Sequence, residues 1–212
     1  MNPYVVLGVG LLAQVLFSAR LLIQWIASER AKRVLSPVIF WQLSMIASFL
    51  LCLYGWLRND FAIISGQLVS YYIYIWNLKE KGAWKKVHRA LRLLFLGTPL
   101  AAVLWFLLDW DYTFAHLFTQ EDIPVWLIVF GTLGQFTFTL RFVYQWWYSR
   151  RVGESVLPMN FWLISLTGSV MIISYALIRH DLVLILGQST GVVAYTRNIV
   201  LLYRERVRNR LR

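Results

Sequence analysis

The sequence contains one long stretch twice. Residues 10–77 and residues 131–198 align without a gap at a constant offset of 121, and about a third of the aligned positions are identical. Internal repetition constrains a fold more than any single motif, because both copies are expected to form the same unit. A unit of this length is too long for a solenoid repeat. Its length is that of half a membrane transporter, a class of protein that is often built from two such halves.

The composition indicates a polytopic membrane protein. Of the 212 residues, 59% are hydrophobic and only 15% are charged, whereas soluble domains carry about 25% charged residues. Several apolar runs reach the roughly 20 residues that span a bilayer. The net charge of +11 comes from loops and the C-terminal tail, so we interpret it as cytoplasmic anchoring and not as nucleic-acid binding. Cys52 is the single cysteine and predicts no intramolecular disulfide.

Seven membrane-spanning helices are predicted from the apolar runs. Three belong to each copy, and one between the copies has no counterpart in the repeat. Their expected ranges are 3–27, 37–57, 61–78, 93–110, 124–148, 158–178 and 182–203. We therefore predict an all-α integral membrane protein in three parts. These are a first three-helix repeat over 1–79, a basic loop with a linker helix over 80–121, and a second three-helix repeat with a basic tail over 122–212.

The distribution of Lys and Arg predicts the orientation. Sixteen of these residues lie in the loops after the first, third and fifth helices and in the C-terminal tail, whereas only Arg58 and Arg179 lie on the opposite side. Basic loops remain in the cytoplasm, so we expect the N-terminus outside and the C-terminus in the cytoplasm. The linker helix restores the direction of the second triplet, which makes the two copies parallel repeats.

Three basic residues fall inside predicted spans, namely Arg20, Arg141 and Arg197. Arg20 and Arg141 are a repeat pair, and none of the ten acidic residues falls at their expected depth. An arginine at membrane depth suggests a function. Two interpretations stay open for this pair. Each side chain snorkels to the cytoplasmic surface or bonds helix-end carbonyls and the neighbouring glutamine, or together they form a pocket for an anionic group such as phosphate. For Arg197, which is nearer the surface, we expect snorkelling.

Other repeated side chains are candidates for the same pocket. At helical spacing, Gln24 shares a face with Arg20, and Gln145 shares a face with Arg141. The remaining candidates lie on the third helix of each copy or at the cytoplasmic end of the second helix: Gln67, Tyr74, Asn77, Gln188, Tyr195, Asn198, Trp41 and Trp162. Structural alternatives are polar contacts between helices for Gln67 and Gln188 and interfacial anchoring for the tryptophans.

The sequence does not indicate an enzyme active site. His88 falls on the predicted cytoplasmic side, whereas His116 and His180 fall outside, so no Ser–His–Asp arrangement is expected within one compartment. There is no zinc-ligand spacing, no phosphate-binding glycine loop and no pair of carboxylates on one helix face. We expect no catalytic residue, no metal and no cofactor.

The repeated motifs resemble the lipid A biosynthesis N-terminal domain family. The first copy contains RLLIQW, SP, FW, RND, GQ and YxxN in this order, and the second contains RFVYQW, LP, FW, RHD, GQ and YxxN. The layout of three, one and three helices is also similar to that of SWEET and PQ-loop transporters, although neither copy has a Pro-Gln dipeptide. In SWEET-like carriers an asparagine of the third helix lines the pocket, which by position implies Asn77 and Asn198.

This resemblance implies a multi-pass protein of the bacterial inner membrane in lipid A or lipopolysaccharide-related envelope biosynthesis. The main hypothesis is a carrier or flippase for a lipid-linked sugar or polyprenyl phosphate, in which Arg20 and Arg141 hold the phosphate. Alternatives are an accessory subunit of a membrane glycosyltransferase, a lipid A-modifying enzyme and a SWEET-like carrier of free sugar. The family is associated with lipid-A-disaccharide synthase, whose catalytic part resembles a soluble two-domain glycosyltransferase. The resemblance does not extend to that part, so we expect no synthase activity.

Overall fold

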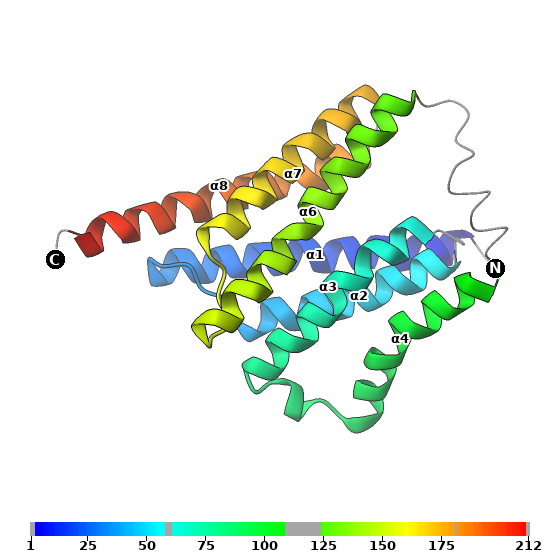
Figure 1. Ribbon diagram of the computed structural model, residues 1–212, viewed down its shortest axis with the longest axis horizontal. Coiled ribbons are helices and arrows are strands. Elements are labelled where there is room, and N and C mark those ends of the chain that lie inside the picture. The colour runs from blue at the N-terminus through cyan, green and yellow to red at the C-terminus, as the bar shows by residue number, and fades with distance from the viewer. Residues whose placement is uncertain (1–2, 58–60, 109–123, 181, 211–212) are drawn as a thin grey trace. The chain divides into compact units, whose positions relative to one another are not determined.

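The computed structural model describes residues 3–57, 61–108, 124–180 and 182–210, and the regular elements in these ranges are helices (Figure 1). They are α1 (Pro3–Ala31), α2 (Val38–Leu57), α3 (Phe61–Glu80), a short 3₁₀ helix η1 (Trp84–Lys86), α4 (Arg89–Leu108), α6 (Val125–Val152), α7 (Met159–Ile178) and α8 (Leu182–Arg210). The predicted all-α class is confirmed. Arg58, Asp181 and the predicted outer loop within 109–123, with His116, lie outside the described residues.

Several helix ends differ from the predicted ones. α1, α6 and α8 continue one to two turns beyond the predicted ends, and α4 begins one turn earlier. The added turns are rich in Arg, Glu and Ala, which favour helix, so the helices continue where the apolar runs stop. Pro37 and Pro158, predicted as first helical residues, instead precede α2 and α7.

α1 and α6 end in the same left-handed turn. Gly153 follows α6 with a φ of 76°, and its amide donates to the carbonyl of Ser149 at 2.9 Å. The equivalent residue after α1 is Lys32, which has a φ of 53°, and the next amide, that of Arg33, donates to the carbonyl of Ser28 at 3.3 Å. A left-handed conformation costs roughly 1–2 kcal/mol for a residue with a side chain. The first copy therefore makes the turn with a less favourable residue than the second.

The chain forms two compact units. The first unit comprises Met1–Phe17 and Trp41–Ile123, and the second comprises Ser18–Phe40 and Pro124–Arg212. α1 therefore contributes its first half to the first unit and its second half to the second unit. Because of this division, Arg20 of the first repeat copy and Arg141 of the second copy belong to the same unit.

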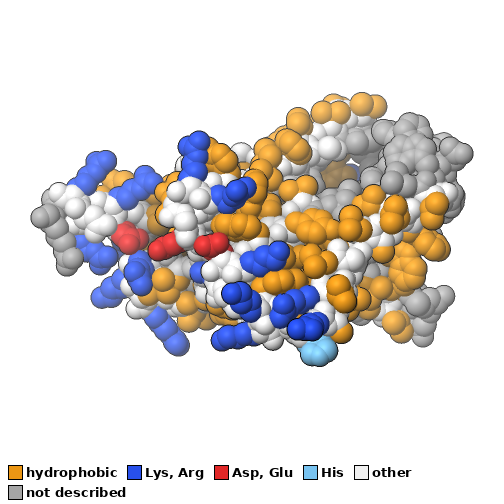
Figure 2. All heavy atoms as spheres, turned by 60° about the horizontal axis from the view of Figure 1, so that its bottom comes forward, with side chains coloured by type: hydrophobic (Ala, Val, Ile, Leu, Met, Phe, Trp, Pro, Cys, Tyr) orange, Lys and Arg blue, Asp and Glu red, His pale blue; other side chains and the backbone are white. Residues whose placement is uncertain are grey.

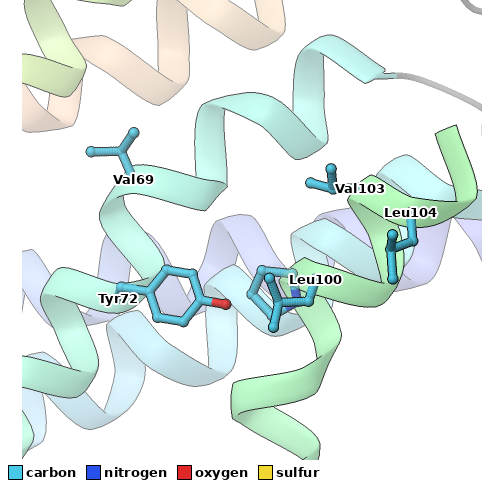
Figure 3. A pocket seen from close by; sticks show the side chains of 6 residues that line it. Val69, Tyr72, Leu100, Val103 and Leu104 are labelled. Atoms are coloured by element: carbon cyan, nitrogen blue, oxygen red, sulfur yellow. The ribbon is translucent and has the colours of Figure 1, made fainter. Parts of the chain in front are cut away.

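In the first unit, aromatic pairs join α2 to α4. Phe49 and Phe95 meet edge to face with 5.7 Å between ring centres, and Trp56 and Trp105 do so with 5.9 Å. Such pairs add about 0.5–1.5 kcal/mol each beyond the area that they bury. α4 also packs on α3 beside a proline inside α4, where an open apolar groove remains (Figure 3). The groove is lined by Val69, Tyr72, Pro99, Leu100, Val103 and Leu104.

In the second unit, α7 packs against both α6 and α8. An added Cβ at Gly168 of α7 would lie 2.8 Å from the backbone nitrogen of Phe138 on α6, so only glycine fits this approach. A Cβ at Gly131 of α6 would lie 2.7 Å from the Tyr175 ring of α7. Small residues at helix contacts let membrane helices approach closely, and here they fix the spacing of α6 and α7.

The outer surfaces of these helices are apolar. Large hydrophobic side chains such as Leu108 and Val125 are more than three quarters exposed. Figure 2 shows hydrophobic side chains over much of the visible helix surface, with Arg side chains on the C-terminal turns of α8. α1, α2, α6 and α7 are long and apolar enough to cross a membrane. Apolar outer faces around buried polar side chains indicate a membrane protein.

Candidate functional site

Arg141 lies on α6 inside a cluster of aromatic rings. It is 5% exposed, and its guanidinium carbon lies 3.3 Å from the centre of the Phe138 ring and 4.6 Å from that of Phe142. Its Nη1 donates a hydrogen bond to the hydroxyl of Tyr195 on α8 at 3.3 Å. Aromatic faces carry partial negative charge and stabilise a desolvated cation by about 2 kcal/mol or more. The rings therefore offset part of the cost of burying this charge.

Arg20, the repeat equivalent of Arg141, reaches the same cluster from α1. It is 4% exposed, and its guanidinium carbon lies 5.2 Å from the centre of the Phe40 ring and 5.5 Å from that of Phe142. Phe142 therefore contacts both guanidinium groups. A snorkelling side chain keeps its charged end in water, so the burial of both arginines does not fit the snorkelling interpretation.

The shared ring brings two positive charges close together. Both guanidinium carbons lie within 5.5 Å of the centre of the Phe142 ring. They are thus no more than about 10 Å apart, and at an effective dielectric constant near 20 their repulsion is at least about 1.5 kcal/mol. An anionic group bound between them would add two attractions that outweigh this repulsion. The geometry therefore suits an anionic ligand.

Gln145, a predicted pocket residue, holds the loop that follows α6. Its Nε2 donates to Ser149 Oγ at 2.9 Å and to the carbonyl of Val156 at 3.0 Å. Ser149 Oγ in turn accepts a hydrogen bond from the amide of Val156 at 3.1 Å. Gln145 and Ser149 are fully buried. We call this arrangement of a glutamine, a serine and the following loop the loop clamp; it fixes where the chain turns back toward α7.

Gln24 forms the same loop clamp in the first copy and has one further partner. Its Nε2 donates to Ser28 Oγ at 2.9 Å and to the carbonyl of Leu35 at 3.1 Å, and the amide of Leu35 donates to Ser28 Oγ at 3.0 Å. Gln24 and Asn198 of α8 also exchange two amide hydrogen bonds, at 2.9 and 3.1 Å. This reciprocal pair joins helices of the two repeat copies within the second unit.

The serines of the loop clamp were missed as candidates from the sequence. Ser28 and Ser149 each lie four residues after the clamping glutamine and are identical in the two copies. That spacing places each serine beside its glutamine on one helix face. The signal was therefore present in the repeat and could have found both residues.

Trp41 and Trp162 lie in the interior of the protein. Both are 0% exposed, whereas an interfacial anchor presents its ring to the lipid headgroups, so that interpretation is wrong for both residues. Each indole packs on the repeated tyrosine of its own unit. The ring centres are 6.1 Å apart for Trp41 and Tyr74 and 5.9 Å apart for Trp162 and Tyr195.

Gln67 and Gln188 make matching contacts between neighbouring helices. The hydroxyl of Ser48 donates to Gln67 Oε1, and that of Ser169 donates to Gln188 Oε1, both at 2.8 Å. These bonds join α2 to α3 and α7 to α8. They are the polar contacts between helices that were the structural alternative for the glutamines.

The candidate residues divide between the two units. The second unit contains Arg20, Gln24, Arg141, Gln145, Trp162, Gln188, Tyr195 and Asn198, and the first contains Trp41, Gln67, Tyr74 and Asn77. Asn77 is fully buried, and its side-chain amide donates to the carbonyl of Ile73 at 2.8 Å. Phe142, which contacts both arginines, was not predicted, because the equivalent residue of the first copy is Leu21 and the repeat gives no signal.

Arg197 forms an ion pair with Glu29 instead of only snorkelling. Arg197 Nε contacts Glu29 Oε1, and Nη2 donates to Oε2 at 3.0 Å. Trp25 Nε1 also donates to Glu29 Oε1, at 3.1 Å. The two side chains of the ion pair are about one third exposed. The sequence reasoning missed this partner because it ended the helix at residue 27, whereas α1 continues to Ala31 and includes Glu29.

The cluster around Arg20 and Arg141 offers hydrogen-bond donors between aromatic walls. Guanidinium and indole groups donate hydrogen bonds and accept none, and a tyrosine hydroxyl can do both. Such a set suits a ligand with anionic oxygens, which guanidinium binds through two parallel hydrogen bonds. Among the residues that the structure describes, no three His, Cys, Asp or Glu side chains are grouped so as to hold a metal ion.

Known proteins match this chain over both repeat copies. The model of the Lipid A Biosynthesis N-terminal domain family matches residues 9–79 and again residues 130–200, which together make up about two thirds of the chain. Curated relatives include the proteins named lipid-A-disaccharide synthase of Chlamydia felis (29% identical over 212 residues) and Chlamydia caviae (30% over 212 residues). Each alignment covers 95% of this chain but only 34% of the relative. No solved structure gives a significant match.

Proposed function

We propose that this chain, which belongs to the lipid A biosynthesis N-terminal domain family, is a carrier of the bacterial inner membrane. Its cargo would be a lipid-linked sugar or a polyprenyl phosphate. The family and the named relatives relate the chain to lipid A biosynthesis at a membrane. One observation supports the step from this relation to an anionic lipid. Two repeat-related guanidinium groups are buried against the single ring of Phe142.

The proposed carrier has seven membrane-spanning helices. Two parallel triplets are joined by α4, with the N-terminus in the periplasm and the C-terminus in the cytoplasm. The apolar lengths of α1, α2, α6 and α7 support this arrangement. So does the concentration of Lys and Arg at the C-terminal ends of α1, α3 and α6, in the loops after α1 and α3, and in the C-terminal turns of α8, since such basic segments remain cytoplasmic.

In this proposal the headgroup phosphate is bound by Arg20 and Arg141. The two guanidinium groups lie over the rings of Phe40 and Phe138, and a guanidinium binds a phosphate through N–H groups that lie in its own plane. Movement of one repeat against the other then alternates access to the phosphate. The Gln24–Asn198 amide pair, which joins α1 to α8, separates in that movement.

A flip assay in proteoliposomes tests the carrier. We expect Arg20→Gln and Arg141→Gln each to slow transfer of a fluorescent polyprenyl-phosphate sugar by at least about tenfold, because a hydrogen bond to a charged group contributes roughly 1.5–3 kcal/mol. Arg150→Gln is the matched control, since its guanidinium lies over the Trp146 ring at the end of α6, away from the cluster. Unchanged transfer in both cluster variants would remove the proposed role of the arginines.

The relatives favour one second candidate, an accessory subunit of a membrane glycosyltransferase. The curated relatives are about three times as long as this chain and are named as a synthase. In them, the matched region is therefore part of one polypeptide with the remaining two thirds. If the present chain serves such an enzyme, it co-purifies with a glycosyltransferase from membranes and gives no signal in the flip assay. Transfer by the purified chain alone would exclude a purely accessory role.

A further inference from the structure

We infer that the indole N–H of Trp162 is a third donor to the oxyanion bound by Arg141, and that this part of the site takes a phosphate group and not a neutral sugar. The inference rests on the proposed function and specifies the ligand chemistry of its site. Trp162 begins the second turn of α7, and Arg141 and Tyr195 come from α6 and α8. Three helices of the second unit therefore contribute.

The first argument is the state of the indole N–H itself. Trp162 is 0% exposed, and within the described part of the chain its Nε1 has no hydrogen-bond partner. Most buried polar side-chain atoms in proteins have a partner, and each exception needs an explanation. An indole N–H can only donate. The missing partner is therefore an acceptor, either a ligand oxygen or a bound water, and these two can be distinguished.

The second argument is that the indole and the Arg141 guanidinium share aromatic neighbours. The centre of the Trp162 ring lies 5.9 Å from that of Tyr195, with an angle of 37° between the rings. The guanidinium carbon of Arg141 lies 5.8 Å from the centre of the same tyrosine ring. Phe161 is a second shared neighbour, with its ring centre 4.8 Å from that of Trp162 and 6.0 Å from the guanidinium carbon. The indole and the guanidinium thus share two aromatic neighbours.

Tyr195 supplies a further donor between them. Its hydroxyl oxygen accepts a hydrogen bond from Arg141 Nη1, so its own proton remains available to donate. A Cβ at Gly191 would lie 2.8 Å from this hydroxyl oxygen. The glycine thus leaves room for the Tyr195 side chain to extend toward the N-terminus of α8. The first copy has Ser70 at the equivalent position. The room for this hydroxyl is therefore particular to the second copy.

The donor set selects the chemical class of the ligand. A guanidinium and an indole only donate hydrogen bonds, and the tyrosine hydroxyl has already accepted one. A sugar hydroxyl must donate as well as accept, and here it would lose its donor bond. A phosphate oxygen only accepts hydrogen bonds and carries negative charge, which a guanidinium binds strongly. The phosphate can belong to a lipid headgroup or to a soluble anion, and the test separates the two sources.

The test uses the full chain in nanodiscs with three probes: geranyl phosphate, inorganic phosphate and geraniol. The Trp162 indole ¹⁵N–¹H resonance is assigned by its loss in Trp162→Phe, which keeps an aromatic ring and removes the N–H. We expect geranyl phosphate to shift this resonance and geraniol to leave it unchanged. We also expect Trp162→Phe to weaken geranyl phosphate binding by about tenfold, the effect of one hydrogen bond to a charged group. Trp147→Phe, an exposed tryptophan of α6, is the control.

The outcomes separate the possibilities. A shift with geranyl phosphate alone supports a lipid headgroup, and a shift with inorganic phosphate as well supports a general phosphate site. If neither phosphate moves the resonance, the N–H is bonded to water and the inference is wrong, even where Arg20→Gln and Arg141→Gln abolish transfer and uphold the carrier. Should Trp162→Phe fail to fold, the Trp162 resonance is assigned by elimination with Trp→Phe variants at the other ten tryptophans, and its shift in the wild-type protein still decides. Gly191→Ala, which displaces the Tyr195 hydroxyl, then serves as the binding variant.

Discussion

The two copies of the repeat share the side-chain contacts that position their helices and loops, and they differ in the residues around their charged side chains. Both have the loop clamp, in which Gln24 with Ser28 and Gln145 with Ser149 hold equivalent residues of the following loop. Both also have the serine–glutamine bond between the second and third helices and a tryptophan packed on a tyrosine.

The differences lie at and near the arginines. The Glu29–Arg197 ion pair has no counterpart, because the equivalent residues are Arg150 and Trp76. Phe142, which contacts Arg20 and Arg141, corresponds to a leucine in the first copy. The duplicated sequence thus repeats what positions the helices and varies what surrounds the charges. A site made from two equivalent arginines is therefore asymmetric, and a single ligand can distinguish its two sides.

The largest effect is expected where the copies differ in size. Gly168 of α7 corresponds to Ala47 in the first copy, so Gly168→Ala would make the copies alike at this position. Its Cβ would lie 2.8 Å from the backbone of Phe138, and we expect a loss of about 2–3 kcal/mol in the free energy of unfolding from overpacking.

The measurement for Gly168→Ala is reversible unfolding in mixed micelles. Gly187→Ala is the matched control, because the same added methyl group has no neighbour within 4 Å there; it should be at least as stable as the parent, by up to about 1 kcal/mol, because alanine favours helix over glycine. Equal stabilities of the two variants would show that α6 and α7 are not in this close contact.

An intermediate effect is expected where the copies agree. Ser28→Ala and Ser149→Ala each leave a buried glutamine amide and a loop amide without the serine oxygen. We expect each to lower the free energy of unfolding by about 1–3 kcal/mol, the cost of leaving buried polar groups unsatisfied, and the two losses to be similar.

The control for the serine pair is Ser174→Ala, whose hydroxyl is exposed and donates within its own helix to the carbonyl of Val170. It should change stability by less than about 0.5 kcal/mol. A loss in Ser149→Ala without a similar loss in Ser28→Ala would mean that the loop clamp supports only the second copy, and the agreement between the copies would then be superficial.

The sequence predicted the helices well because the signal was strong and local. Apolar runs fixed the helical segments, and the repeat selected Arg20, Arg141 and the glutamines as internal polar residues. The ends of α1, α6 and α8 were placed too early, since charged residues that favour helix continue past the apolar run.

The contacts of the candidate site could not be predicted in the same way. Phe142 differs between the copies, so the repeat did not identify it, and only the three-dimensional structure of the second unit shows that it contacts both arginines. The ion pair of Glu29 and Arg197 joins residues that are 168 positions apart. Such a pairing depends on which helices become neighbours, and periodicity within one helix does not contain that information.

The smallest effect is expected at the Glu29–Arg197 ion pair, the charged contact that only one copy has. Its side chains are about one third exposed, and partly exposed pairs are weakened by water and salt. We expect Glu29→Gln and Arg197→Gln each to lower the melting temperature less than the serine variants do, and the double variant to be no less stable than either single one, because the pair is lost only once. Arg150→Gln, at the position equivalent to Glu29, should instead add independently to Glu29→Gln. Additive losses of stability for Glu29→Gln and Arg197→Gln would contradict the ion pair itself. A coupling energy between the two substitutions that persists in 1 M salt, where the Debye length is about 3 Å, would contradict its partial exposure and require a contact between α1 and α8 that excludes water.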